Sequence, residues 1–203
     1  MKDQATLDFY AREAEAYATL YSVSEELGRF LALVPAGGRI LELGCGGGQD
    51  SEAMLAAGYD VTPTDGSPEL ARQAEKRLAR PVNVLLFEDI DFVDVFDGVW
   101  ANACLLHAPK PSLPTILGKI ERALRSGGVL YASFKTEGAE GADQFGRYYN
   151  YPDERYLREA LSAGNWSSVE IEQRSGTGYY NLPAEWLHLL AVRGPATLRE
   201  RPI

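Results

Sequence analysis

The sequence has few residues of the kinds that hold metals. Two cysteines and two histidines occur in 203 residues, and neither pair has the spacing of a CxxC or HxxxH motif. Structural zinc sites draw about four such ligands from closely spaced pairs. We therefore expect no metal site in this protein.

Long apolar runs and basic clusters are also missing. No apolar stretch approaches the roughly 18 residues of a membrane span, and residues 1–18 are polar and acidic, unlike a secretory signal. The formal net charge is −9, and no run of Lys and Arg offers the basic face that usually meets nucleic-acid phosphates. We expect a cytoplasmic protein that binds neither membranes nor nucleic acids.

The remaining composition is that of an ordinary soluble protein. Hydrophobic residues make up 45% of the chain and charged residues 24%, values typical of globular domains. A chain of this length buries roughly 70% of its unfolded surface. No linker or internal repeat divides it, so we predict a single domain over residues 1–203.

Glycine is concentrated at one point of the chain. An apolar run at 40–43 is followed by Gly44, Gly46, Gly47 and Gly48, four glycines within five positions. Such density predicts backbone conformations, or close approaches of other groups, that a Cβ would prevent.

The residues after these glycines complete a unit of nucleotide-binding type. Asp50 and Ser51 are candidate N-caps for a helix over 52–57, and a strand over 59–64 ends on Asp65. Asp65 follows the first glycine by 21 positions, close to the spacing at which such an acid reaches a ribose. The alternative for Asp65 is a helix cap or a solvated strand end.

Strands and helices alternate along most of the chain, and the last two strands follow one another without a helix between them. We predict an α/β fold: a Rossmann-like, seven-stranded, mostly parallel sheet with a C-terminal antiparallel hairpin and helices on both faces. The strand at 82–87 is nearly all apolar, which predicts burial on both faces. Predicted strands cover 40–43, 59–64, 82–87, 99–101, 129–134, 169–171 and 186–192. Predicted helices cover 3–20, 24–34, 52–57, 67–78, 112–124 and 153–163, with Asp3, Ser24, Ser67, Ser112 and Asp153 as further caps.

Two segments fall outside this alternation. Residues 1–34 predict a helical N-terminal cap that places Tyr10 and Tyr17 over the glycines, or else a plain surface helix. Residues 136–152 have no periodicity and are long for a connection. They predict either a lid over the site or a surface loop.

Several motifs together resemble those of class I S-adenosylmethionine-dependent methyltransferases. The matching residues are the ExGxGxG pattern at 42–48, the acid Asp65, the triplet 88–90, the LLHAP turn at 105–109 and the segment 122–135. The resemblance covers nearly the whole chain. It is strongest for the small bacterial methyltransferases grouped with tellurite-resistance proteins.

This resemblance implies S-adenosyl-L-methionine as the cofactor. The glycines would lie against its methionine and ribose parts, Asp65 would accept the ribose hydroxyls, and Asp89 with the Ile90 backbone would bind adenine. Asp89 could equally be a plain loop carboxylate. The implied cofactor-binding residues are Tyr17, Glu42, Gly44, Cys45, Gly46, Asp50, Asp65, Gly66, Ser67, Glu88, Asp89, Ile90, Asn102, Ala103 and His107.

The acceptor is expected to be a small molecule. The turn at 102–105 reads Asn-Ala-Cys-Leu, whereas methyltransferases that act on exocyclic or amide nitrogens commonly carry Asn/Asp-Pro-Pro-aromatic there. His107 is a candidate catalytic proton acceptor, or else a structural turn residue. Arg147 is expected to steer an anionic or carbonyl-bearing acceptor. Candidate pocket walls are Tyr148, Tyr149, Tyr179 and Tyr180.

Two other functions remain open at this point. A nicotinamide-dependent oxidoreductase is disfavoured by Gln49, where its fingerprint needs a small residue, and by the lack of a second βαβ half. A non-catalytic cofactor-binding protein is the other alternative. Nothing in the sequence decides between a monomer and a homodimer.

Overall fold

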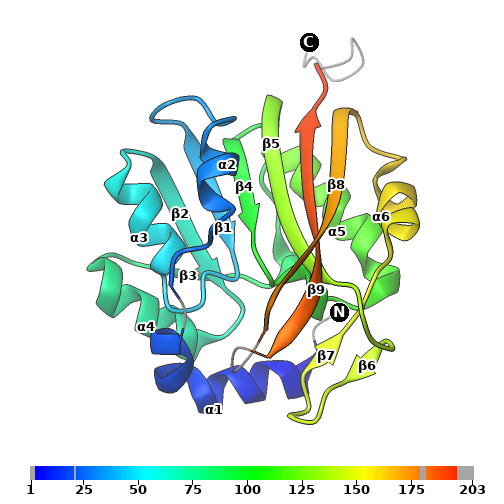
Figure 1. Ribbon diagram of the computed structural model, residues 1–203. Coiled ribbons are helices and arrows are strands. Elements are labelled where there is room, and N and C mark those ends of the chain that lie inside the picture. Colours follow the sequence, from blue (N-terminus) through cyan, green and yellow to red (C-terminus); the bar gives the residue numbers. More distant parts are fainter. Residues whose placement is uncertain (1–2, 21, 179–181, 196–203) are drawn as a thin grey trace.

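The main sheet of the described residues has seven strands, and β9 alone runs opposite to the others (Figure 1). The computed structural model describes residues 3–20, 22–178 and 182–195, and gives the strand order β3-β2-β1-β4-β5-β9-β8. The strands are β1 (Arg39–Leu43), β2 (Asp60–Asp65), β3 (Asn83–Val84), β4 (Phe96–Ala101), β5 (Leu124–Lys135), β8 (Trp166–Thr177) and β9 (Pro183–Arg193). β9 runs antiparallel to β5 and β8 antiparallel to β9, so the predicted α/β fold with a terminal hairpin is confirmed.

Six α-helices are described, and none of them has both the length and the apolar character needed to cross a membrane. They are α1 (Gln4–Leu20), α2 (Leu27–Leu31), α3 (Gln49–Ala56), α4 (Pro68–Leu78), α5 (Leu113–Ala123) and α6 (Glu154–Leu161). The short 3-10 helices are η1 (Phe87–Asp89), η2 (Leu105–His107) and η3 (Lys110–Ser112).

The helices bury both faces of the sheet, as the alternation of side chains on β4 shows. Trp100 belongs to the core beneath α2 and α3, whereas its neighbours Val99 and Ala101 belong to the core beneath α5 and α6. The Trp100 ring stacks on Tyr131 of β5 with centroids 4.1 Å apart and lies 5.1 Å from the ring of Phe30 in α2. These contacts fix the central strands whose carboxyl ends form the site.

Three predicted caps are confirmed by the hydrogen bonds that they make. Asp3 accepts from the backbone N–H of Thr6, Ser67 from that of Leu70, and Asp153 from that of Tyr156. Each of these bonds satisfies one of the N–H groups that a helix start leaves free.

The other predicted caps are wrong. α3 begins at Gln49 after the left-handed Gly48, so Asp50 and Ser51 lie inside its first turn. The Asp50 carboxylate instead accepts from the backbone N–H of Ser24. α2 begins at Leu27, with Glu26 rather than Ser24 at its N-cap position. Ser112 precedes α5 but makes no side-chain cap bond.

The predicted strand over 82–87 is wrong in length and in burial. β3 contains two residues and lies at the edge of the sheet, paired with β2 alone. Val84 is therefore 53% exposed. An edge strand has no second neighbour to cover it, so the apolar character of this stretch serves another purpose, described below.

The carboxyl edge of the parallel strands is covered by α1 and by a small strand pair, β6 (Gly141–Ala142) with β7 (Tyr148–Tyr149) (Figure 1). The segment 136–152 is thus not the structureless loop that we expected. The Tyr148 backbone N–H donates to Thr6 Oγ1 at 2.8 Å, and Asn150 Nδ2 donates to the Leu105 carbonyl at 2.8 Å. These bonds tie its second half to α1 and to η2.

Gly98 lies on β4, at the point where α2 packs closely on the sheet. A Cβ at this position would lie 2.7 Å from the Phe30 ring and 2.9 Å from a Val34 methyl group. We expect Gly98→Ala to lower the free energy of unfolding by about 1–3 kcal/mol because the core is overpacked, as measured by urea denaturation.

The matched control is Gly118→Ala, on the exposed side of α5, where a Cβ meets nothing within 4 Å. It should raise stability by up to about 1 kcal/mol because alanine is the better helix former. A Gly98→Ala protein as stable as the wild type would show that α2 can shift away without cost.

Candidate active site

The glycine turn between β1 and α3 is held against the C-terminal end of α1. A Cβ at Gly47 would lie 2.6 Å from the Ala18 carbonyl oxygen, so only glycine permits this approach. Gln49 Nε2 donates to that same oxygen at 2.8 Å, and Arg77 Nε donates to the Gly47 carbonyl at 2.7 Å. α1 is thereby fixed across the turn.

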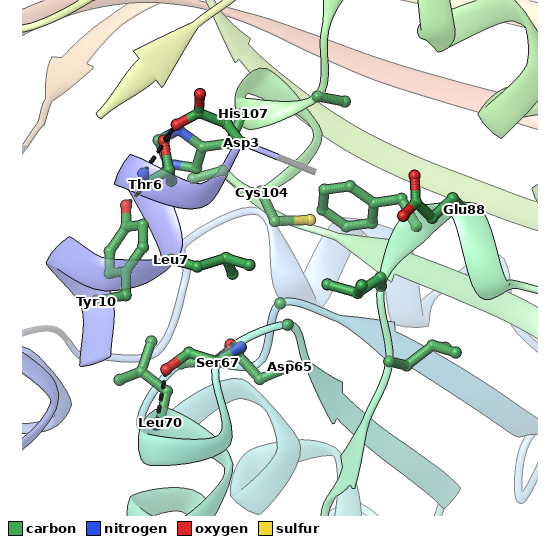
Figure 2. A pocket seen from close by; sticks show the side chains of 18 of the residues that line it. Asp3, Thr6, Leu7, Tyr10, Asp65, Ser67, Leu70, Glu88, Cys104 and His107 are labelled. Atoms are coloured by element: carbon green, nitrogen blue, oxygen red, sulfur yellow. Dashed lines mark hydrogen bonds between the residues drawn. The ribbon is translucent and has the colours of Figure 1, made fainter. Parts of the chain in front are cut away.

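A small cavity of about 110 Å³ lies beside α1, at the ends of β1 and β2 (Figure 2). The turn and Asp65 form one side of it, and Leu7 and Tyr10 of α1 project into it. Another part of the lining is apolar and comes from the chain that follows β3, next to Asp65. That part consists of Leu85, Leu86 and Phe87, with Glu88 at its edge. The apolar run at 82–87 is therefore mainly a cavity wall, a role that periodicity could not reveal.

Asp65 places a buried carboxylate in this cavity. Its oxygens accept from the backbone N–H of Gly46 at 2.9 Å and of Ser67 at 2.8 Å. Burial raises the pKa of Asp65 to about 6, although these backbone bonds act to lower it. The group is thus ionised at neutral pH and becomes protonated in mild acid.

A larger cavity of about 590 Å³ adjoins the small one and shares Gly44, Gly46 and other lining residues with it. Glu42 and Asp50 line the larger cavity. Burial, followed by repulsion from Asp50, raises the pKa of Glu42 to about 8, and the carboxyl group is hydrogen-bonded to the Ser51 hydroxyl. Asp50 accepts from the Trp100 indole N–H at 2.9 Å. Two acids that are costly to ionise therefore stand beside one another.

Tyr10, Tyr17 and His107 line both cavities. His107 Nδ1 lies 2.6 Å from the Tyr148 carbonyl oxygen, which can only accept, so Nδ1 carries the proton. Nε2 is then the acceptor for the Tyr10 hydroxyl at 2.8 Å. Burial lowers the pKa of His107 to about 4, so the imidazole is neutral at pH 7.

The cations around the larger cavity differ in how they are held. Arg147 lines the cavity but is only 3% exposed, and its guanidinium binds the Asp143 carboxylate with a closest distance of 2.7 Å. Lys135, at the end of β5, also lines the cavity, and its side chain forms no ion pair or hydrogen bond with the described residues. Lys135 did not stand out in the sequence.

Most of the site residues predicted from the sequence gather around these two cavities. Glu88 lines the smaller one, whereas Asp89 is exposed and Ile90 is buried in the core, and neither lines a cavity. Tyr149 lines the larger cavity, but the Tyr148 hydroxyl turns away to Glu140. Tyr179 and Tyr180 lie outside the described residues. The predicted residues that line a cavity are Tyr17, Glu42, Gly44, Cys45, Gly46, Asp50, Asp65, Gly66, Ser67, Glu88, Asn102, Ala103, His107, Arg147 and Tyr149.

Within the described ranges, no group of three His, Cys, Asp or Glu side chains is placed to hold a metal ion. Cys45 and Cys104 are both buried, and burial raises the pKa of each thiol well above its usual value. They act as small packing groups. Cys104 fits against Gly44, where a Cβ would lie 2.5 Å from the Cys104 Cβ.

Known proteins share this sequence pattern over part of the chain. Residues 41–132 match a protein-family model described as a methyltransferase domain. The ubiquinone biosynthesis O-methyltransferase of Xanthomonas axonopodis pv. citri is 36% identical over 108 residues, which are 50% of this chain and 44% of that protein. The match thus spans less than half the length of this curated relative.

Solved structures share the fold over almost the whole chain. The 1,6-didemethyltoxoflavin-N1-methyltransferase of Burkholderia thailandensis superposes with a TM-score of 0.72 at 21% identity, covering 94% of this chain and 88% of that one. TehB from Haemophilus influenzae gives a TM-score of 0.66 at 14% identity, covering 91% and 67%. At such identities the likeness is one of fold.

The buried carboxyl group of Glu42 should make stability depend on pH. Between its ordinary pKa of about 4.5 and its folded value of about 8, the native state binds a proton that the unfolded chain has released. Stability from this group is therefore full below about pH 4.5 and falls as the pH rises. We expect Glu42→Gln to remove roughly 1–3 kcal/mol of the loss that the wild type shows between pH 6 and pH 8, measured by urea denaturation at both values.

The exposed Glu137 provides the control, because Glu137→Gln should leave the wild-type pH dependence unchanged. Equal slopes in wild type and Glu42→Gln would mean that Glu42 is ionised in the folded protein.

Proposed function

We propose that this chain, which belongs to the class I S-adenosylmethionine-dependent methyltransferases, transfers the methyl group of S-adenosylmethionine to a small-molecule acceptor. The observation that carries the proposal is the buried Asp65 carboxylate, held by the glycine turn at the end of β2 and facing the cavity beside α1. A carboxylate there is suited to accept hydrogen bonds from two vicinal ribose hydroxyls.

The smaller cavity suits the adenosine part of the cofactor. Leu85, Leu86 and Phe87 offer an apolar surface for a flat base. Glu88, at the edge of this surface, is better placed than Asp89 to accept an exocyclic amino group. We therefore assign the adenine contact to Glu88 in place of Asp89.

The larger cavity suits the methionine part and the acceptor. Glu42 and Asp50 form an acidic corner that would favour a bound ammonium group. The same cation would lower the pKa of Glu42 by favouring its charged form. Tyr10 and Tyr17, whose rings pack edge to face with centroids 5.0 Å apart, lie between the two cavities. Ring faces attract cations, and a sulfonium carries a positive charge.

The chain's own contribution to the reaction is positioning and exclusion of water. The bound cofactor supplies an activated methyl group on a sulfonium, so the protein must align an acceptor in line with it and keep water out. α1 and the β6–β7 pair cover the edge of the sheet where this alignment would take place (Figure 1). The curated relatives are named O-methyltransferases, which supports a hydroxyl oxygen as the acceptor atom.

A hydroxyl acceptor must lose its proton, and Tyr10 with His107 forms a route for it. The Tyr10 oxygen would take the acceptor's proton while its own proton moves to His107 Nε2. The bond from His107 Nδ1 to the Tyr148 carbonyl holds the ring in the tautomer that leaves Nε2 free to accept. The low pKa of His107 keeps it unprotonated across the neutral range.

The whole proposal can be tested with methyl-labelled S-adenosylmethionine and a pool of small hydroxylated compounds. We expect labelled product and S-adenosylhomocysteine in equal amounts. Tight binding of NAD without binding of S-adenosylhomocysteine would instead support the nicotinamide alternative. Cofactor binding without transfer to any compound would support a non-catalytic protein.

Asp65→Ala tests the ribose contact. Loss of charge-assisted hydrogen bonds worth roughly 1.5–3 kcal/mol should weaken S-adenosylmethionine binding by about ten- to a hundredfold. Wild-type affinity should also fall below about pH 6, where Asp65 becomes protonated. Both are measured by calorimetric titration. The control is Asp60→Ala, at the exposed start of the same strand, which should bind normally; unchanged affinity in a folded Asp65→Ala protein would exclude the contact.

Tyr10→Phe and His107→Gln test the proton route. If Tyr10 and His107 act as one unit, each substitution should lower kcat by roughly a hundredfold. The double variant should then be no slower than either single variant. Affinity for S-adenosylhomocysteine should change by less than about threefold, because Tyr10→Phe keeps the aromatic ring and the product lacks the sulfonium charge. Strictly additive losses, or wild-type turnover in either variant, would reduce the pair to a structural contact.

A further inference from the structure

Lys135 holds a positive charge in the larger cavity without a direct ion-pair partner among the described residues. Its Nζ lies 5.0 Å from the centroid of the Tyr149 ring and 5.6 Å from that of Trp186. Trp186 faces Lys135 across the β5–β9 ladder. No ion pair or hydrogen bond joins the Lys135 ammonium to any residue that the structure describes.

The other cations of this cavity are neutralised. Arg147 binds both carboxylate oxygens of Asp143. Oδ1 accepts a hydrogen bond from the Arg147 backbone N–H at 2.9 Å, and Oδ2 accepts one from the Arg147 guanidinium at 2.7 Å. Arg174 is paired at 2.5 Å with Glu26 and with Glu172. Lys135 is thus the cavity cation that the described part of the chain leaves unpaired.

This position is unfavourable for the ammonium when no ligand is bound. Burial, and then repulsion from Arg147, lowers the pKa of Lys135. Aromatic faces compensate only in part, because a cation–π contact is worth roughly 0.5–2 kcal/mol. A bound anion would remove the penalty, since a partly buried ion pair strengthens as water leaves it.

We propose that Lys135 is the recognition group for an anionic substituent of the methyl acceptor. The inference rests on the methyl-transfer function proposed above. The Tyr149 and Trp186 rings that lie near the ammonium also line the cavity, so a flat, conjugated body suits the space next to the charge. The acceptor class is therefore an aromatic or conjugated carboxylate that also carries the hydroxyl to be methylated. Arg147, which we expected from the sequence to bind this anion, serves instead to fix the β6–β7 segment through Asp143.

The test compares matched anionic and neutral probes on protein saturated with S-adenosylhomocysteine. The probes are benzoate, 4-hydroxybenzoate and 3,4-dihydroxybenzoate, each paired with its amide. Calorimetric titration should show at least one carboxylate binding about tenfold or more tightly than its amide. Lys135→Met should remove this preference by weakening the carboxylate and sparing the amide, and Lys135→Arg should keep much of it.

Lys110→Met is the matched control. The Lys110 Nζ also lies 5.0 Å from a tyrosine ring, that of Tyr156, but Lys110 lines neither cavity. Its removal should leave the carboxylate preference intact. An unchanged preference in Lys135→Met, equal binding of every acid and amide, or no binding of any carboxylate at millimolar concentration would each overturn the proposal.

Failure of this inference can be told apart from failure of the proposed function. S-adenosylhomocysteine binding is measured first, on wild type and on Lys135→Met, and should be equal within about threefold. If the cofactor product does not bind, the methyl-transfer function is wrong, and the probe titrations on ligand-free protein still report whether Lys135 selects anions. Normal binding of S-adenosylhomocysteine with no anion preference would reject the Lys135 assignment alone.

Discussion

The contact between Gly47 and the backbone of Ala18 determines where the rest of the site lies. Because no Cβ separates them, the end of α1 rests directly on the glycine turn. That placement brings Tyr10 to His107, and it brings Thr6 to the backbone of β7. One close approach therefore couples the N-terminal helix, the turn and the β6–β7 segment. Both cavities form between these parts.

The site contains several acidic side chains, and burial disfavours their ionised forms. Glu42 and Asp65 are buried, and desolvation raises the pKa of both. Hydrogen bonds offset part of the desolvation cost of these carboxyl groups: Ser51 donates to Glu42, and the backbone of the turn donates to Asp65. A cationic ligand would stabilise the ionised forms. This acidic half contrasts with the opposite wall of the larger cavity, where Lys135 carries the unpaired positive charge.

The sequence allowed prediction of the features that local patterns encode. Strand alternation, the terminal hairpin, the glycine turn and the acid ending β2 all follow from short-range signals. The strand at 82–87 was predicted too long because apolar residues at 85–87 look the same whether they face a core or a cavity. The partner of Arg147, Asp143, could be identified only once β6 and β7 were paired, and Lys135 was not singled out from the sequence. Which charged side chains pair, and how long β3 is, both depend on contacts between segments far apart in the sequence. Local sequence patterns do not reveal such contacts.

The two edges of the sheet differ in a way that bears on self-association. Exposed strand edges tend to recruit further strands from other molecules. β3 presents only two residues, which is too short a template for another strand. β8 is long, but Glu170, Glu172 and Arg174 lie along it and bind Arg29 and Glu26. Charged side chains along an edge strand disfavour the docking of another strand, so both edges of the described sheet are poor templates for edge-to-edge pairing.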